Sequence, residues 1–243
     1  MDSRQQDSTD LIARAVKINA GVWASQLKVT AGRNVVDAAH DVVAAKTADG
    51  SVSPGIAIDV AALGGMYANK IRLMGTETGV GVHNAGNIGA SAGDVVVNAD
   101  GSISNSGYIT ATNNVQLTTG DHLDNQGHLY ALANTTVSSR GTLTNRGVIA
   151  AQNNTTVSAA GINSNKTSVF AAGMGSDGAL AAAGDLSLTS QGKLTVNGKN
   201  SAAGRLTVQG AVLDFSDSQT YGNNVSIQAT TAVITTSGAT RYA

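Results

Sequence analysis

A motif of seven residues recurs along the middle of the chain at a spacing close to 20 residues. It reads N-A-G-N-I-G-A, N-S-G-Y-I-T-A, N-Q-G-H-L-Y-A and N-R-G-V-I-A-A, with spacings of 21, 20 and 20, and begins at Asn84, Asn105, Asn125 and Asn145. A fifth copy, N-K-T-S-V-F-A, begins 20 residues later at Asn165 and lacks the glycine. A repeat of this fixed period indicates a solenoid, in which each repeat packs only on its neighbours.

The pattern within each repeat is that of a β-strand. Apolar and polar residues alternate, as in Ile103 and Asn105 and then Ile109 and Ala111. This two-residue period is typical of strands, and the many Val, Ile and Thr residues favour them. Because a propeller blade takes about 40 residues, a shorter repeat does not fit that fold. The sequence therefore predicts an all-β parallel β-helix (β-solenoid) with about 20 residues per coil.

The same period predicts which side chains lie inside the coils. Equivalent positions of successive coils lie directly above one another, about 4.8 Å apart. Ile109, Leu129 and Ile149 occupy the fifth position of successive repeats, so we expect them to form one internal stack. Tyr130 follows Leu129 and should point outward by alternation.

The composition excludes several classes of protein. Charged residues make up 13% of the chain, aromatic residues 3%, and the formal net charge is −1, which argues against a nucleic-acid-binding protein. No apolar run approaches the roughly 20 residues that a membrane span requires. The chain has no cysteine, so disulfides and thiolate metal sites are excluded. The first ten residues are polar and acidic, so we expect this fragment to have no signal peptide of its own.

The segment before the repeats has a distinctive sequence. It reads L-G-G-M-Y-A-N-K-I-R-L over residues 63–73 and T-E-T-G-V-G-V over residues 76–82. This motif closely resembles the filamentous hemagglutinin family, which includes hemagglutinin-type adhesins and the stalks of contact-dependent growth-inhibition toxins. In that family the segment follows the two-partner secretion domain and opens the hemagglutinin repeats. The residues that carry the resemblance are Gly64, Gly65, Met66, Tyr67, Lys70, Glu77, Gly79 and Gly81.

The resemblance covers most of the chain and implies a division into four parts. Residues 1–36 resemble the terminal coils of a secretion domain, and residues 37–62, which contain the single proline Pro54, are expected to form an excursion loop or hairpin. Residues 63–172 are expected to form the hemagglutinin-repeat β-helix. Residues 173–243 are expected to form continuing, less regular coils after an Ala/Gly-rich loop at 173–184.

The family resemblance also implies where such a protein works. It implies a right-handed parallel β-helix and export through an outer-membrane transporter of the two-partner secretion type. It implies a place outside the cell or on the bacterial surface, and a receptor on a host or neighbouring cell. We expect neither a nucleic-acid partner nor a membrane-spanning segment.

The repeated asparagines are candidates for a structural ladder at the turns. Asn84, Asn105, Asn125, Asn145 and Asn165 are expected to stack coil over coil, with their amides hydrogen-bonded along the axis. The alternative is a ligand-binding stripe. Glu77 is the only glutamate, and an ion pair with Lys70 or Arg72 between neighbouring coils, or a contact with a partner, would explain it.

Catalytic and metal sites are less well supported by the sequence. His122 and His128 lie near Asp121 and Asp124, but the alternating pattern places these histidines toward solvent, which argues against a metal site. Asp214 and Asp217 resemble the paired carboxylates of polysaccharide-cleaving β-helix enzymes. No clustered lysines or arginines accompany them, so we expect solvated turn residues, no enzymatic activity and no cofactor.

We therefore interpret the chain as a structural stalk segment of a large secreted bacterial exoprotein, serving adhesion or toxin presentation. The alternatives are an adhesin whose rod binds glycans or proteins directly, and a polysaccharide lyase or hydrolase of the β-helix type.

Overall fold

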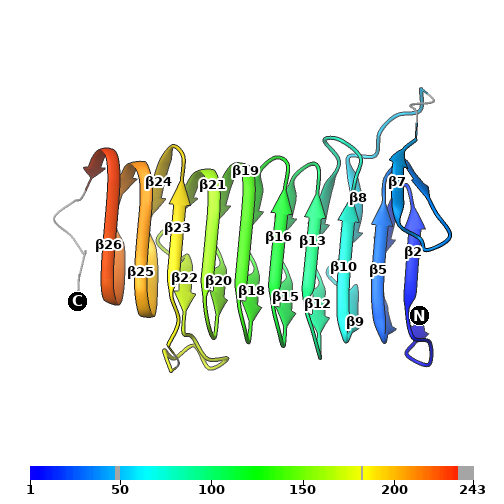
Figure 1. The fold of residues 1–243 in the computed structure, drawn as a ribbon, viewed down its shortest axis with the longest axis horizontal. Helices are drawn as coiled ribbons and strands as arrows, with labels where there is room; N and C mark the ends of the chain where they lie inside the picture. The colour runs from blue at the N-terminus through cyan, green and yellow to red at the C-terminus, as the bar shows by residue number, and fades with distance from the viewer. Residues whose placement is uncertain (47–49, 182, 235–243) are drawn as a thin grey trace.

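The chain forms a rod of stacked coils (Figure 1). The computed structural model describes residues 1–46, 50–181 and 183–234. All regular elements in these residues are strands, and they wind into a parallel β-solenoid of about 11 turns with roughly 20 residues per turn. The prediction of a parallel β-solenoid with this period is therefore confirmed.

Each coil contributes one strand to each of three faces of the rod, and within a face the strands pair in parallel. Face 1 contains β2 (Thr9–Ala13), β5 (Gln26–Ala31), β10 (Lys70–Gly75), β13 (Val95–Ala99), β16 (Val115–Thr119), the first parts of β19 (Thr135–Asn145) and β21 (Thr155–Ser164), β23 (Leu186–Ser190), and the middle parts of β25 (Gly198–Asp214) and β26 (Ser218–Ile234).

The next strand of each coil belongs to face 2. This face contains β3 (Val16–Ile18), β8 (Ile56–Val60), β11 (Gly81–Asn84), β14 (Ile103–Asn105), β17 (Leu123–Asn125), the last parts of β19 and β21, β24 (Lys193–Val196), and the last parts of β25 and β26.

Face 3 completes the coil. It contains β1 (Asp2–Ser3), β4 (Gly21–Ala24), β9 (Gly65–Ala68), β12 (Asn87–Ala90), β15 (Tyr108–Ala111), β18 (His128–Ala131), β20 (Val148–Ala151), β22 (Val169–Ala172), and the first parts of β25 and β26.

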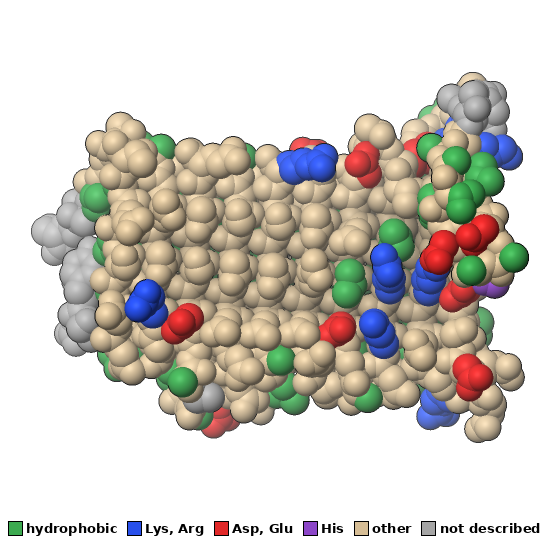
Figure 2. Space-filling model, in the orientation of Figure 1, with side chains coloured by type: hydrophobic (Ala, Val, Ile, Leu, Met, Phe, Trp, Pro, Cys, Tyr) green, Lys and Arg blue, Asp and Glu red, His purple; other side chains and the backbone are tan. Residues whose placement is uncertain are grey.

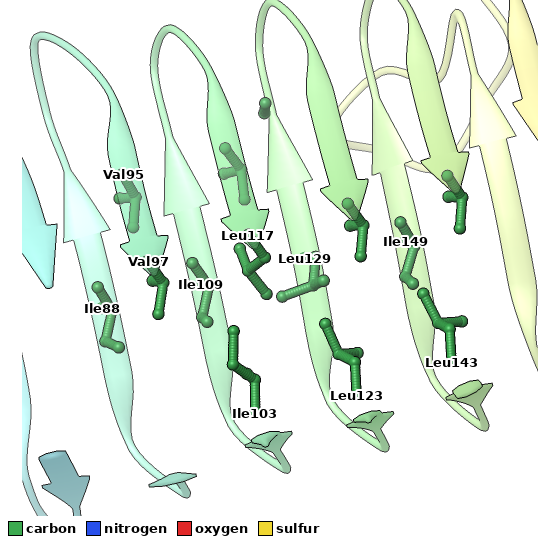
Figure 3. Close-up of a cluster of buried hydrophobic side chains, with 14 of the residues drawn as sticks. Ile88, Val95, Val97, Ile103, Ile109, Leu117, Leu123, Leu129, Leu143 and Ile149 are labelled. Carbon is green, nitrogen blue, oxygen red and sulfur yellow. The ribbon is translucent and has the colours of Figure 1, made fainter. Parts of the chain in front are cut away.

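The core is a set of apolar columns that run along the rod axis (Figure 3). In face 3, Ile109 pairs with Leu129 and Leu129 with Ile149, and all three side chains are buried. Face 2 contributes the column Ile103, Leu123, Leu143, and face 1 contributes Val97, Leu117, Val137 and Val157. Parallel pairing in register places like residues over like residues, which confirms the predicted internal stack.

An excursion leaves the rod after β5. Its strands β6 (Asn34–Val36) and β7 (Val42–Ala45) form an antiparallel hairpin outside face 1. Lys28 Nζ donates hydrogen bonds to the His40 carbonyl oxygen (2.9 Å) and to Asp41 Oδ1 (2.7 Å), and His40 Nδ1 lies 2.7 Å from Asp10 Oδ2. These contacts hold the hairpin against β2 and β5.

The structure corrects the limits expected for this excursion, residues 37–62. The hairpin already begins at residue 34, and β8 has returned to face 2 by residue 56. The pairing of β8 with β11 shifts register between Gly81 and Val82, and both Ala57 and Ile58 are buried. This irregularity breaks the alternation, which is why the sequence pattern did not reveal the strand.

A second excursion leaves after β22 and returns at β23. Its described part lies against the outside of face 3, where Ala150 and Ala171 point outward and yet are fully buried. Tyr130 points outward too, as predicted, but its hydroxyl donates a hydrogen bond to the Met174 carbonyl oxygen (2.9 Å) and its side chain is half-buried. The excursion therefore converts part of the outer surface into a second, small packing layer.

Candidate functional site

A ladder of buried asparagines runs along the corner between faces 2 and 3. Asn84, Asn105, Asn125 and Asn145 pair in register at the ends of their strands, and each is at most 1% exposed. The Nδ2 group of each of the first three donates to Oδ1 of the next asparagine at 2.8 Å. The remaining amide hydrogens reach carbonyl oxygens of the corner, such as Gly127 O (3.3 Å) and Val148 O (3.2 Å) for Asn125.

These hydrogen bonds turn the asparagines inward. The buried amides satisfy one another and the backbone of the corner, as buried polar groups must. Their Nδ2 and Oδ1 atoms are engaged within the rod, so the ladder presents a supporting structure for the corners and no ligand-binding stripe.

Asn165 was expected to be the fifth member, and the structure corrects this expectation. Ser164 takes the position above Asn145, and Asn165 lies just past the strand end. The cause is a register shift between Ser139 and Thr142, where β21 turns the corner with one residue fewer than β19. Ser164 Oγ donates to the carbonyl oxygens of Thr195 (2.8 Å) and Asn197 (2.9 Å) and so continues the polar corner.

The glycine of each repeat is required by the close approach of neighbouring corners. A Cβ atom on Gly107, Gly127 or Gly147 would lie 2.0–2.1 Å from the carbonyl oxygen of the equivalent glycine in the preceding coil. Gly86 meets Gly64 O in the same way at 2.2 Å. Gly64 of the family motif is therefore the first member of the same glycine column, and the motif and the repeats share one corner geometry.

The other residues of the motif lie in or between β9, β10 and β11, some with buried and some with exposed side chains. Met66 is buried in the core, whereas Lys70 is exposed. The ring of Tyr67 lies over Gly65, whose Cβ would meet it at 2.7 Å. Gly79 has a left-handed backbone (φ 74°), and a Cβ on Gly81 would lie 2.7 Å from Ser102 O.

Glu77 anchors the first excursion. Its carboxylate accepts hydrogen bonds from Arg14 Nε (3.1 Å) and Nη2 (2.9 Å) and from Ser53 Oγ (2.7 Å), and it lies 3.7 Å from Arg33 Nε. The expected ion pair exists, but its partners are Arg14 and Arg33, not Lys70 or Arg72. Arg33 and Ser53 belong to the two ends of the excursion, so these contacts tie both ends to the rod.

We expect Glu77→Gln to destabilise the fold only above about pH 2. Hydrogen bonds from Arg14 and then Ser53 lower the pKa of Glu77 from 4.5 to about 2. A lowered carboxyl pKa in the folded state stabilises the fold above the unfolded pKa, and this stabilisation is lost as pH falls from 4.5 toward 2. The free energies of unfolding of the two proteins, measured by urea titration, should therefore differ by about 0.5–1 kcal/mol at neutral pH. They should converge at acid pH.

Asp100→Asn is the control, because Asp100 is exposed and lies outside this cluster. A Glu77→Gln deficit that persisted unchanged at pH 2 would contradict the electrostatic explanation.

The candidate catalytic and metal residues are each engaged in a separate pair. His122 Nδ1 pairs with Asp121 Oδ2 at 3.1 Å on an exposed surface, and the His128 ring stacks on Tyr108 with centroids 4.8 Å apart. Asp214 pairs with Lys193 (2.9 Å) and Asp217 with Lys166 (3.2 Å). Among the described residues, no group of three or more His, Cys, Asp or Glu side chains could hold a metal ion.

On the face of the rod drawn in Figure 2, charged side chains of both signs are present. In Figure 2, the charged side chains gather toward the N-terminal end and along two edges, and a broad uncharged area lies between them. Of the described residues, none belongs to a helix long and apolar enough to cross a membrane.

Comparison with known proteins assigns the family. A family model of the two-partner secretion domain, "TPS secretion domain", matches residues 1–105. The chain is 50% identical over 243 residues, its full length, to "Toxin CdiA" of Yersinia pestis. These matches support a two-partner secretion exoprotein of the filamentous hemagglutinin-like family.

Other exoproteins of this family match smaller parts of the chain. It is 50% identical over 231 residues (95% of the chain) to "tRNA nuclease CdiA-2" of Burkholderia pseudomallei, and 44% identical over 127 residues (50% of the chain) to "tRNA nuclease CdiA" of Escherichia coli strain NC101. The chain spans only 7%, 7% and 4% of the lengths of these three relatives. No solved structure matches it.

Proposed function

We propose that this segment is a structural stalk of a much longer exoprotein. The observation that carries the proposal is the parallel pairing of each coil with the next along the described rod, which continues through local register shifts. Coils pair directly from β12 to β15 and from β13 to β16, across residue 105, where the match to the secretion-domain family model ends. In such a solenoid each coil is supported by its neighbours, so length can be added without a new core.

The four parts defined from the sequence would then differ in the type of repeat but together form one continuous folded rod. Residues 1–36 and 63–172 are proposed to be consecutive stretches of one rod, and residues 37–62 to contain the excursion. The less regular coils from residue 173 extend the same three faces.

The names of the relatives favour toxin presentation by the parent protein. Two of the three are named as tRNA nucleases and one as a toxin, and the segment corresponds to a small share of each. We propose that the parent protein is exported through an outer-membrane two-partner secretion transporter and stands outside the cell. A receptor on a neighbouring or host cell would be contacted by other parts of the parent, and this segment would be non-enzymatic.

Removing one whole coil tests the stalk directly. In the full-length parent protein, deletion of residues 115–134 brings residue 135 into the place of Val115, because Val115 and Thr135 pair in register. The rod should shorten by about 4.8 Å and keep its core, so secretion and activity toward neighbouring cells should be unchanged. Deletion of residues 115–124 removes half a coil and should abolish both, because the remaining strands lose their register.

Two results would contradict the stalk. Loss of cell attachment on removing the whole coil, with secretion intact, would show that the segment itself binds the receptor. Normal behaviour of the half-coil deletion would show that the continuous register is not needed.

A further inference from the structure

The chain contains one asparagine that is followed directly by a glycine. This pair, Asn197–Gly198, lies at the turn between β24 and β25, near the C-terminal end of the described rod (Figure 1). The backbone nitrogen of a residue can attack the side-chain amide of an asparagine that precedes it, and glycine has no side chain to hinder this attack. In the repeat motif one residue separates each asparagine from its glycine, so the repeats do not contain this pair.

The fold requires the glycine of this pair. Gly198 has a left-handed backbone (φ 82°), which glycine adopts far more readily than any residue with a side chain. A Cβ atom on Gly198 would lie 2.5 Å from the carbonyl oxygen of Ser168 and 2.6 Å from that of Asn165. Any other residue would therefore be strained here, and the tight corner itself keeps a glycine next to Asn197.

The side-chain amide of Asn197 lacks the hydrogen bonds that hold the asparagine ladder. In the ladder, Asn145 Oδ1 accepts hydrogen bonds from a neighbouring asparagine (2.8 Å) and from Gly147 N (3.2 Å). Asn197 Oδ1 is buried, and among the described residues it has no hydrogen-bond partner. The backbone N–H of Gly198 donates to the Asp217 carbonyl oxygen at 3.2 Å, the long end of the usual range. Neither of the two groups that would react is therefore firmly held by another partner.

We propose that Asn197 is a site of spontaneous deamidation in the folded rod. The backbone nitrogen of Gly198 forms a bond to Cγ of Asn197 and loses its proton, and the side-chain nitrogen leaves as ammonia. Asn197 is only half-buried, so water reaches the resulting cyclic imide and opens it at either of its two carbonyl groups. The products are aspartate and isoaspartate, in which the main chain runs through the side-chain carbon atoms.

Conversion to isoaspartate would disturb the coils that follow. It lengthens the main chain by one carbon atom at a corner where the carbonyl oxygens of Asn165 and Ser168 already approach Gly198 closely. The strand after this corner, β25, pairs with β22, β23 and β24, and β26 pairs with β25. Because each coil packs only on its neighbours, we expect β25 and β26 to loosen and the coils far from this corner to keep their structure.

Peptide mapping of the whole folded chain, aged at mildly alkaline pH, tests the chemistry. Trypsin cleaves after Lys193 and Lys199 and releases the pair in one short peptide. Chromatography with mass spectrometry should find the aspartate and isoaspartate forms of this peptide, and they should form faster at higher pH, because the attacking nitrogen must lose its proton. Conversion at Asn197 should be at least about tenfold faster than at Asn163, an exposed asparagine that is followed by serine.

Asn197→Gln is the matched control. It keeps the amide, but the same attack would have to close a larger ring, so its peptide should stay unconverted under the same conditions. Hydrogen exchange of the aged unmodified chain should become faster in β25 and β26 and stay unchanged in β16. The aged Asn197→Gln variant should show no such change, and thermal melts of both freshly prepared proteins should show that they are folded.

Two results would overturn the proposal. The first is an intact Asn197 in the folded chain after a period in which the urea-unfolded chain is fully converted, because the fold would then protect the pair. The second is unchanged hydrogen exchange in β25 and β26 after conversion, which would show that the corner tolerates isoaspartate. The stalk proposal is independent of both, because its test removes a coil that does not contain Asn197.

Discussion

Leu129→Asp is expected to lower the free energy of unfolding by about 4 kcal/mol. Leu129 is fully buried and lies between Ile109 and Ile149 in the internal column of face 3. A carboxylate there would have apolar neighbours on both sides along the axis. The urea midpoint of the variant should fall sharply, and the fall should be smaller at acid pH, where the aspartate is neutral.

Gln116→Asp is the matched control for this prediction. Gln116 lies in the middle of β16 and is exposed, next to the buried Leu117. The same new charge on the outside of the rod should change the free energy of unfolding by less than about 0.5 kcal/mol. Equal losses in the two variants would mean that the inward and outward positions of the strands are assigned wrongly.

Asn125→Ala is expected to cost about 3 kcal/mol. The change removes the acceptor of Asn105 Nδ2 and the donor to Asn145 Oδ1, both at 2.8 Å in a buried corner. It also removes the donor to Val148 O (3.2 Å). Each buried polar group left without a partner costs about 1–3 kcal/mol, so the loss should exceed that of an ordinary hydrogen bond.

Asn87→Ala provides the comparison for the ladder. Asn87 lies in β12 of face 3, just past the same corner, and its side chain is exposed. Its replacement should leave the urea midpoint nearly unchanged. If Asn125→Ala also left the urea midpoint unchanged, the asparagine ladder would contribute little to the stability of the rod. The glycine column would then be the feature that determines the geometry of the corners.

Two of the deviations from the predicted pattern involve an excursion. The expected ion pair of Glu77 pointed to residues close by in sequence, yet its carboxylate bonds to Arg14, 63 residues away. Tyr130 was predicted to face solvent, and it points outward but lies under Met174 of the second excursion. Arg14 and Glu77 meet because β2, β5 and β10 pair in register although the first excursion separates β5 from β10 in the sequence, and Met174 belongs to the second excursion. The repeat period carries no information about the length or path of an excursion.

The sequence by itself determined the coil length, the inward columns and the corners. A period of 20 places Ile109, Leu129 and Ile149 over one another, and the repeated asparagines and glycines form the corner beside them. The tertiary structure alone decided the rest. The one-residue shortening of β21 that replaces Asn165 by Ser164, and the packing of both excursions on the outside of the rod, depend on contacts between coils. Such contacts join residues whose separation follows no repeat, so no local pattern can encode them.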